Sequence, residues 1–224
     1  MTNFLLLTEK EWHDSLFRNL KNRKGENWSR IKKKEKLSFT FLNKFKPDKI
    51  FIPHWSYIIP ENIWIKHECI VFHMTDLPYG RGGSPLQNLI VNGHKKTKVS
   101  AFKVSKGVDT GPIYLKKNLE LSGSAKEIFY KSSEVIYKMI AEIIDNKLIP
   151  IPQTGKVKTF KRRSADQSDI SHLSKLDSIF DYIRMLDCDG YPKAYIEING
   201  IKYEFNNVKH NNNSLEANVR IKRI

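Results

Sequence analysis

The chain has 224 residues, of which 40% are hydrophobic and 11% aromatic, a composition that excludes intrinsic disorder and is sufficient for one domain with a small appendage. Lys and Arg number 39 against 24 Asp and Glu, and the formal charge of +15 favours anionic partners: nucleic acid, acidic membrane or phosphorylated metabolites. Two cysteines are too few for a disulfide framework, and no stretch approaches the roughly 20 apolar residues of a membrane span. A compositional bias toward Lys, Asn and Ile explains much of the charge equally well. We therefore expect a cytoplasmic protein without membrane contact.

Short apolar runs alternate with amphipathic patterns over the first 150 residues. The apolar runs predict strands at 4–7, 49–53, 69–72 and 97–104, with another beginning at 113. Helical spacing predicts helices at 12–20, 37–45, 63–65, 85–92 and from 124 to 144, and residues 21–36 form a basic loop with room for one short strand. This alternation is typical of an α/β domain with a mostly parallel sheet.

Two sequences predict capping boxes, in which a hydroxyl and a carboxylate three residues later satisfy the first N–H groups of a helix. The first is Thr8-Glu9-Lys10-Glu11 and the second is Ser124-Ala125-Lys126-Glu127. Pro85 suits a first helical turn and Gly93 a C-terminal cap, which supports the helix predicted between them.

The α/β pattern ends near Pro152, and a different organisation follows. A helix is predicted around 176–186, then strands at 193–198 and 201–205 joined by Asn199-Gly200, a strong two-residue hairpin signal, and a third strand at 215–222. We predict three parts: an α/β catalytic domain (1–155), a basic connector (156–172) and a small α+β region with a β-meander (173–224). The edge strands of the meander could support a homodimer, because such edges need covering.

Polar and glycine residues gather between the predicted strand at 69–72 and the helix at 85–92. His73 follows the strand directly, and Asp109 lies in the glycine-flanked turn 107–111. Loops at the carboxyl ends of strands line the ligand crevice of an open α/β sheet, so these two side chains could form an acid/base pair. Taken singly, each has an ordinary structural explanation: histidines are often structural, turns favour Asp, and Arg81 could be solvated or pair with a phosphate.

In combination, these residues resemble the folate-dependent formyltransferase family. That family carries a His-x-Ser-x-Leu-Pro-x-x-Arg-Gly-x-x-Pro signature followed by an Asp-Thr-Gly turn. Its counterparts here are His73, Thr75, Leu77, Pro78, Arg81, Gly82 and Pro85, then Asp109-Thr110-Gly111. The resemblance covers roughly residues 45–163, including Gln153 and Gly155, and it implies a Rossmann-like fold.

The resemblance implies transfer of a formyl group from N10-formyltetrahydrofolate to a primary amine. His73 and Asp109 would be catalytic: the imidazole stabilises the tetrahedral oxyanion, and the carboxylate holds His73 protonated and accepts the proton of the amine. The folate-binding residues implied are Trp55, Ser56, Tyr57, Ile58 and Asp109, although Trp55 and Tyr57 could equally be core or rim aromatics. The substrate-binding residues expected are Thr75, Arg81 and Gly82, and no metal is expected.

One departure from the family pattern concerns the oxyanion. The family usually has Asn two residues before the histidine, and this chain has Val71 there. Loss of one oxyanion donor can lower a rate roughly a hundred- to a thousandfold. His54, Thr75 and Asn88 are candidates to replace it. His54, which also follows a strand end, is the first choice for a third catalytic residue, although a histidine bonded to backbone explains that position as well.

Three branches of the family differ in the amine that they formylate. Methionyl-tRNA formyltransferases suit the charge but resemble considerably longer chains, and glycinamide ribonucleotide formyltransferases resemble chains with an N-terminal glycine-rich phosphate loop that residues 5–10 lack. Enzymes that formylate nucleotide-linked amino sugars resemble chains of this size, and the segments 160–163 and 189–192 are similar to theirs.

We therefore predict a sugar N-formyltransferase of the flagellin or surface-glycan (pseudaminic-acid) type. Its partners would be folate and a UDP- or dTDP-linked 4-amino-4,6-dideoxy sugar, whose pyrophosphate Arg81 could contact. The alternatives are a methionyl-tRNA formyltransferase-like enzyme and a catalytically weak relative that binds only sugar nucleotide or nucleic acid. Nucleic acid is the less expected partner, because the aromatic residues of 39–45 have helical spacing and no RNA-binding signature is present.

Overall fold

A computed structural model describes residues 1–224, and strands and helices alternate along it. The strands are β1 (Thr2–Leu7), β2 (Glu26–Ile31), β3 (Lys49–Pro53), β4 (Cys69–His73), β5 (Tyr79–Gly82), β6 (Lys96–Lys103), β7 (Ile113–Glu120), β8 (Lys158–Phe160), β9 (Ala194–Ile198), β10 (Ile201–Asn211) and β11 (Ser214–Arg223). The α-helices are α1 (Asp14–Lys21), α2 (Phe39–Phe45), α3 (Glu61–Trp64), α4 (Pro85–Val91), α5 (Ala125–Asp145) and α6 (Leu176–Arg184). Three short 3-10 helices are η1 (Glu11–His13), η2 (Lys34–Lys36) and η3 (Ala165–Ser168).

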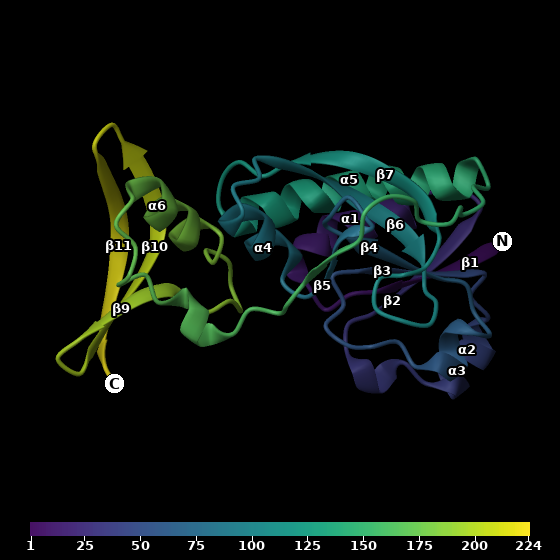
Figure 1. Cartoon of the computed structure of the whole chain (residues 1–224). Coiled ribbons are helices and arrows are strands. Elements are labelled where there is room, and N and C mark those ends of the chain that lie inside the picture. Colours follow the sequence, from purple (N-terminus) through teal and green to yellow (C-terminus); the bar gives the residue numbers. More distant parts are fainter. The chain divides into compact units, whose positions relative to one another are not determined.

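The six-stranded central sheet has the order β2-β1-β3-β4-β6-β7 (Figure 1). Strands β1 to β4 run parallel to one another, and β6 runs antiparallel to β4. This confirms the predicted α/β class and mostly parallel sheet. In the β3–β4 pair, Pro53 lies opposite Phe72, which brings the carboxyl ends of the two strands to the same level.

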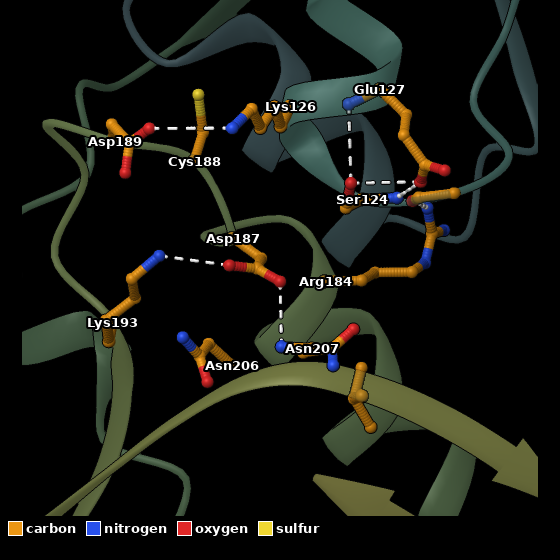
Figure 2. Close-up of a pocket in the computed structure, with 12 residues that line it drawn as sticks. Ser124, Lys126, Glu127, Arg184, Asp187, Cys188, Asp189, Lys193, Asn206 and Asn207 are labelled. Carbon is orange, nitrogen blue, oxygen red and sulfur yellow. Dashed lines mark hydrogen bonds and ion pairs between the residues drawn. The ribbon is translucent and has the colours of Figure 1, made fainter. Parts of the chain in front are cut away.

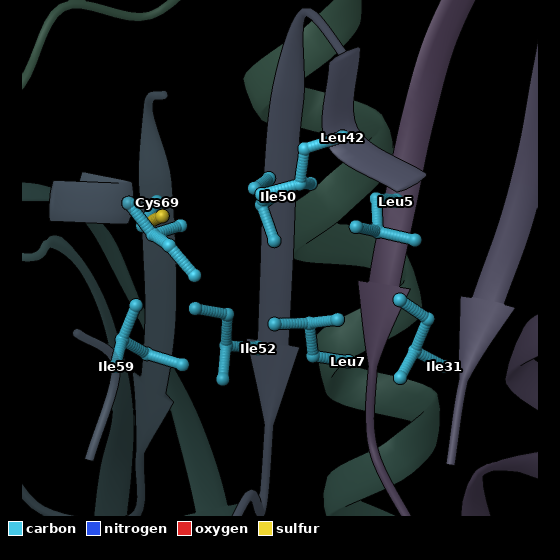
Figure 3. Packing of buried hydrophobic residues seen from close by; sticks show 9 residues of the cluster. Leu5, Leu7, Ile31, Leu42, Ile50, Ile52, Ile59 and Cys69 are labelled. Atoms are coloured by element: carbon cyan, nitrogen blue, oxygen red, sulfur yellow. The ribbon is translucent and has the colours of Figure 1, made fainter. Parts of the chain in front are cut away.

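Alternating side chains of the parallel strands build a core on each face of this sheet. Leu5, Leu7 and Ile52 point toward one face, where Leu42 of α2 and Ile63 of α3 join the cluster (Figure 3). On the other face, where α5 runs, the rings of Phe4, Trp28 and Phe51 contact one another with centroids 5.0 to 5.9 Å apart, and Phe72 packs on Phe51 at 6.3 Å. Each such buried side chain stabilises the fold by about 1.5–3 kcal/mol, so the strands are fixed rigidly.

The chain divides into two compact units. The first comprises Met1–Arg81, Lys98–Leu119 and Tyr130–Thr159, and the second comprises Gly82–Thr97, Glu120–Phe129 and Phe160–Ile224. The predicted boundaries at 155 and 172 do not coincide with this division, because two earlier segments belong to the second unit. The three-part organisation therefore stays a prediction.

The second unit contains a three-stranded antiparallel sheet of order β11-β10-β9, packed with α6. Asn199 and Gly200 both have positive φ, of 50° and 74°, which is the backbone that a tight two-residue hairpin requires. This confirms the predicted helix and meander. Strand β10 runs to Asn211, six residues beyond the predicted end, because the Asn-rich stretch pairs with β11 instead of forming a long turn.

The two predicted capping boxes have different outcomes. At α5 the backbone N–H of Ser124 donates to Glu127 Oε2 at 2.7 Å, and the N–H of Glu127 donates to Ser124 Oγ at 3.3 Å, which confirms the box. The box predicted at Thr8–Glu11 is wrong, since η1 begins there with Lys10 at its N-cap and no side-chain cap. The side chains of Trp12 and His13 instead turn inward and bond the ring of His54, and α1 begins only at Asp14.

No helix of the chain is long and apolar enough to cross a membrane. The cytoplasmic location stays a prediction.

Candidate active site

His73 and Asp109 come together at the carboxyl end of β4. His73 Nδ1 lies 3.7 Å from Asp109 Oδ2, and both side chains are largely buried. The Asp109 turn is held by a close backbone approach: a Cβ on Gly111 would lie 1.7 Å from the carbonyl oxygen of Lys103. Asp109 itself has a left-handed φ of 53°. The sequence-predicted pair is therefore assembled by the fold, although its catalytic role stays a prediction.

The two ring nitrogens of His73 face different protein groups. Nε2 donates to the carbonyl oxygen of Gly80 at 2.8 Å, and the hydroxyl of buried Thr75 donates to the same oxygen at 3.3 Å. Because a carbonyl only accepts, His73 carries a proton on Nε2. Nδ1 faces the carboxylate of Asp109, and this contact is attractive when Nδ1 is protonated too.

Arg81 and Gln153 tie the Asp109 turn to the loop after β4. Arg81 donates to Gln153 Oε1 through Nη2 at 2.7 Å and Nε at 3.2 Å. Gln153 Nε2 donates in turn to the carbonyls of Asp109, at 2.9 Å, and Gly111, at 2.8 Å. The guanidinium of Arg81 is therefore engaged inside the protein, in contrast to the phosphate contact first considered for it.

The residues predicted to bind folate form the loop after β3. Trp55 packs against the core cluster beneath α2 and α3, and Tyr57 contacts the edge of its ring with centroids 5.3 Å apart. Tyr57 and Ile58 are 46% and 91% exposed, and Ser56 donates to Glu9 Oε1 at 2.5 Å. The loop thus presents an anchored aromatic base and an exposed apolar rim, a surface that suits the flat face of a pterin.

His54 is surrounded by rings at the start of the same loop. Trp12 Nε1 donates to His54 Nδ1 at 3.0 Å, His13 Nε2 lies 2.9 Å from the same atom, and the rings of His13 and His54 stack 5.0 Å apart. Burial, then the positive charges of Lys10 and His73, lowers the pKa of His54 to about 3. Burial, then His54 and Arg30, holds the pKa of His13 well below its usual value. Both rings are therefore neutral near neutral pH.

Several predicted positions have structural partners of their own. Val71 packs against Leu77, Phe102 and Ile113, so its position is apolar and offers no donor. Asn88 and Gly82 belong to the second unit. Asn88 donates to the carbonyls of Gly83 and Lys161, both at 2.9 Å, and a Cβ on Gly82 would lie 2.3 Å from the carbonyl oxygen of Phe160.

A polar pocket of about 570 Å³ lies in the second unit (Figure 2). Its charged side chains pair with one another: Lys193 with Asp187 at 3.0 Å and Lys126 with Asp189 at 3.7 Å. None of the predicted site residues lines it. No group of three or more potential metal ligands occurs among residues 1–224.

Sequence reasoning missed Trp12, His13 and Ser133 as site residues. Trp12 carried only the apolar period of a helix, and His13 and Ser133 showed no motif. Ser133 lies on α5 and its Oγ is 2.8 Å from His13 Nδ1, a contact across 120 residues that no local pattern indicates. The cluster of His13 and His54 could be found only from the tertiary structure.

A mostly parallel sheet with a largely buried His–Asp pair at a strand end offers a site for acid–base chemistry. The sequence agrees at the level of the family: residues 15–133 match the formyl transferase family, and residues 165–222 match the methionyl-tRNA formyltransferase C-terminal domain. The chain therefore belongs to the formyl transferase family. Membership confirms the predicted enzyme class, and N10-formyltetrahydrofolate is the formyl donor that the family resemblance implied.

Known relatives distinguish the branches. The chain is 43% identical to a solved methionyl-tRNA formyltransferase from Clostridium thermocellum, with a TM-score of 0.97 and 100% of each chain covered. It is 32% identical over 155 residues to the methionyl-tRNA formyltransferase of Thermodesulfovibrio yellowstonii, covering 64% of this chain and 50% of that protein. The chain thus spans about half the length of that curated relative.

These relatives overturn the predicted sugar substrate. A solved 4-N formyltransferase from Francisella tularensis is only 17% identical, with a TM-score of 0.68 over 88% of this chain and 93% of that one. The prediction rested on chain length and on the similarity of the segments 160–163 and 189–192. A methionyl-tRNA formyltransferase matched over 100% of both chains at 43% identity outweighs both arguments. The nucleotide-linked amino sugar is therefore withdrawn as partner.

Proposed function

We propose that the protein transfers the formyl group of N10-formyltetrahydrofolate to the amino group of methionyl-tRNA. The observation that carries this proposal is the full-length likeness, at 43% identity, to the Clostridium thermocellum protein of that name. The match of residues 165–222 to the C-terminal domain of methionyl-tRNA formyltransferases supports it, because this part lies outside the region that carries the His–Asp pair.

The site residues suit the chemistry of such a transfer. The amine attacks the formyl carbon, the C=O electron pair moves onto oxygen, and the resulting oxyanion needs hydrogen-bond donors. Asp109, 3.7 Å from His73 Nδ1, is placed to take the proton that the amine loses. We assign the binding of the pterin to the loop from Trp55 to Ile58. The part of the site that receives the acceptor amine is assigned to the backbone positioned by Thr75, Arg81 and Gly82.

A basic segment beside this loop supports RNA as the acceptor. Residues 21–36 contain eight Lys and Arg against two Glu, and the whole stretch Lys32–Lys36 is exposed. The ammonium of Lys34 lies 5.4 Å from the ring centroid of Tyr57, so this charge adjoins the proposed folate loop. Clustered Lys and Arg bind phosphate backbones and steer nucleic acid toward a site.

The proposal is tested by incubating the purified protein with N10-formyltetrahydrofolate and methionyl-tRNA, then detecting formylmethionine after hydrolysis of the ester. We expect formylation of methionyl-tRNA and little formylation of free methionine, because the RNA supplies most of the binding. Turnover with free amines or amino sugars but none with methionyl-tRNA would contradict the proposal.

His73→Ala and Asp109→Ala should each nearly abolish this turnover. His67→Ala and Asp189→Ala are matched controls, since neither side chain belongs to the proposed site, and both should retain wild-type kcat. Wild-type kcat in His73→Ala or Asp109→Ala would contradict the assigned roles, and binding without transfer by the wild-type protein would favour the catalytically weak alternative.

A further inference from the structure

Four side chains form a largely buried chain of hydrogen bonds at the end of β3. His13 lies between Ser133 Oγ, 2.8 Å from its Nδ1, and His54 Nδ1, 2.9 Å from its Nε2. Trp12 Nε1 also points to His54 Nδ1, at 3.0 Å. Residues from η1, α5 and the loop after β3 are thereby joined, although the proposed reaction gives His13 and Trp12 no role.

This chain determines which nitrogen of His54 carries the proton. An indole N–H only donates, so the bond from Trp12 makes His54 Nδ1 an acceptor. The proton of the neutral ring must then lie on Nε2. His13 Nε2 faces the same acceptor and donates to it, which leaves His13 Nδ1 to accept from the hydroxyl of Ser133.

The N–H that results has a weak partner. His54 Nε2 lies 3.0 Å from the thioether sulfur of Met74, and thioethers are poor hydrogen-bond acceptors. A carbonyl oxygen, and more so an oxyanion, would form a stronger bond with the same N–H. The contacts with Trp12 and His13 therefore orient this N–H.

His54 stands beside His73. Pro53 of β3 lies opposite Phe72 of β4, and His54 and His73 are the next residues along the chain. His54 Nε2 contacts the sulfur of Met74, the residue that follows His73. The charge of His73 contributes, after burial and Lys10, to the lowered pKa of His54, in agreement with this proximity.

The other groups at this end of the sheet leave a need for such a donor. His73 directs Nε2 to the carbonyl of Gly80 and Nδ1 to Asp109, and Val71 has no polar atom. We propose that His54 Nε2–H is the hydrogen-bond donor to the formyl oxygen during transfer, and that Trp12 and His13 are positioning residues that hold its tautomer. This assignment rests on the formyl transfer proposed above.

The step balances without any further reactant. The amine nitrogen forms a bond to the formyl carbon, and the C=O electron pair moves to the oxygen that His54 Nε2–H stabilises. The amine proton passes to the Asp109 carboxylate. The electron pair on oxygen then re-forms the C=O bond as the C–N10 bond breaks. The electron pair of that bond goes to N10, which takes up the proton from Asp109, and the products are the formylated amine and tetrahydrofolate.

Steady-state kinetics with methionyl-tRNA test the donor role. His54→Ala should lower kcat roughly a hundred- to a thousandfold with little change in KM for either substrate, because the bond forms mainly in the transition state. His54→Gln, whose amide can still donate, should retain more kcat than His54→Ala. His67→Ala controls for removal of a half-buried histidine elsewhere. Wild-type kcat in His54→Ala would overturn the assignment and leave the proposed function intact, whereas an inactive wild-type protein would overturn both.

The tautomer itself is measurable without turnover, which separates the two proposals. In ¹⁵N-histidine NMR spectra of the full chain, His54 should show a protonated Nε2 and an unprotonated Nδ1. Trp12→Phe, which removes the N–H and keeps an aromatic ring, should shift His54 toward the other tautomer and lower kcat less than His54→Ala does. A wild-type His54 with its proton on Nδ1, or a Trp12→Phe variant with an unchanged His54 tautomer, would overturn the assignment.

Discussion

Two residues of the proposed site, His54 and Asp109, have a backbone conformation that most residues with a side chain avoid. Their φ values are 48° and 53°, a left-handed conformation that costs of order 1–3 kcal/mol for a residue with a side chain. The cost is offset by the surrounding contacts: Trp12 and His13 hold the His54 ring, and Gln153 bonds the carbonyl of Asp109. The residues of the motif were visible in the sequence, but this backbone was not.

A substitution at Gly111 tests how far the Asp109 turn depends on close packing. Gly111→Ala should lower the free energy of unfolding by about 1–3 kcal/mol or more, because its Cβ would lie 1.7 Å from the backbone oxygen of Lys103. Gly25→Ala is the control, since its φ is positive but nothing lies within 4 Å of the added Cβ. Chemical denaturation measures both, and equal destabilisation in the two variants would contradict the role of the close approach.

The buried histidines predict an acid-sensitive stability. Their pKa values are lowered in the folded protein, so protons bind the unfolded chain more readily, and stability is lost as pH falls below the unfolded value of about 6.5. Each histidine should contribute up to about 1.4 kcal/mol per pH unit between pH 6.5 and 5, above the range where carboxylates titrate. Urea unfolding at several pH values in this range measures the effect. In His13→Gln the free energy of unfolding should fall less steeply with decreasing pH than in the wild-type protein. The wild-type slope in that variant would contradict the prediction.

Elements with a strong local pattern were predicted well. Strand β3 was predicted at its observed bounds, and α4 and α6 to within two residues. The reason is that the hydrophobic pattern of a buried strand or an amphipathic helix is visible in the sequence. The β5–β8 pair was missed, since its strands have four and three residues and lie far apart in the chain. Such a pairing depends on tertiary contacts rather than on local propensity.

The cap of α5 offers a test at the scale of one element. Ser124→Ala removes the hydroxyl that accepts from the N–H of Glu127, and it should destabilise the protein by about 1 kcal/mol in thermal or chemical unfolding. Ser174→Ala, an exposed serine outside any helix, should change stability by less than about 0.5 kcal/mol. Equal losses in both variants would show that the box adds nothing to the helix.

For the whole molecule, the net charge of +15 is unevenly distributed along the chain, and the segment from residue 21 to 36 carries much of it. Composition alone could not decide between a compositional bias and a binding surface. The structure places the end of this segment at the proposed folate loop, through the contact of Lys34 with Tyr57. At this position the basic segment can contribute to binding of the proposed tRNA acceptor.

Lys33→Glu should therefore raise KM for methionyl-tRNA and reduce the salt dependence of binding by about one unit of slope, as loss of one phosphate contact does. Lys138→Glu, an exposed charge reversal on α5, is the matched control and should change KM for the tRNA less. The measurement is KM at several salt concentrations. Equal effects of the two variants would indicate that only the overall charge matters.

By itself, the sequence determined the α/β class, the order of the main elements, the family motif from His73 to Pro85 and the Asp109 turn. Local periodicity and a specific spacing of residue types carry that information. It misjudged the acceptor, because chain length is a poor guide to substrate. The tertiary structure alone decided that Trp12 and His13 meet His54, that Ser133 meets His13, and that Arg81 faces Gln153. These contacts join segments far apart in the chain, and only the packing of the sheet and its helices brings them within hydrogen-bond distance.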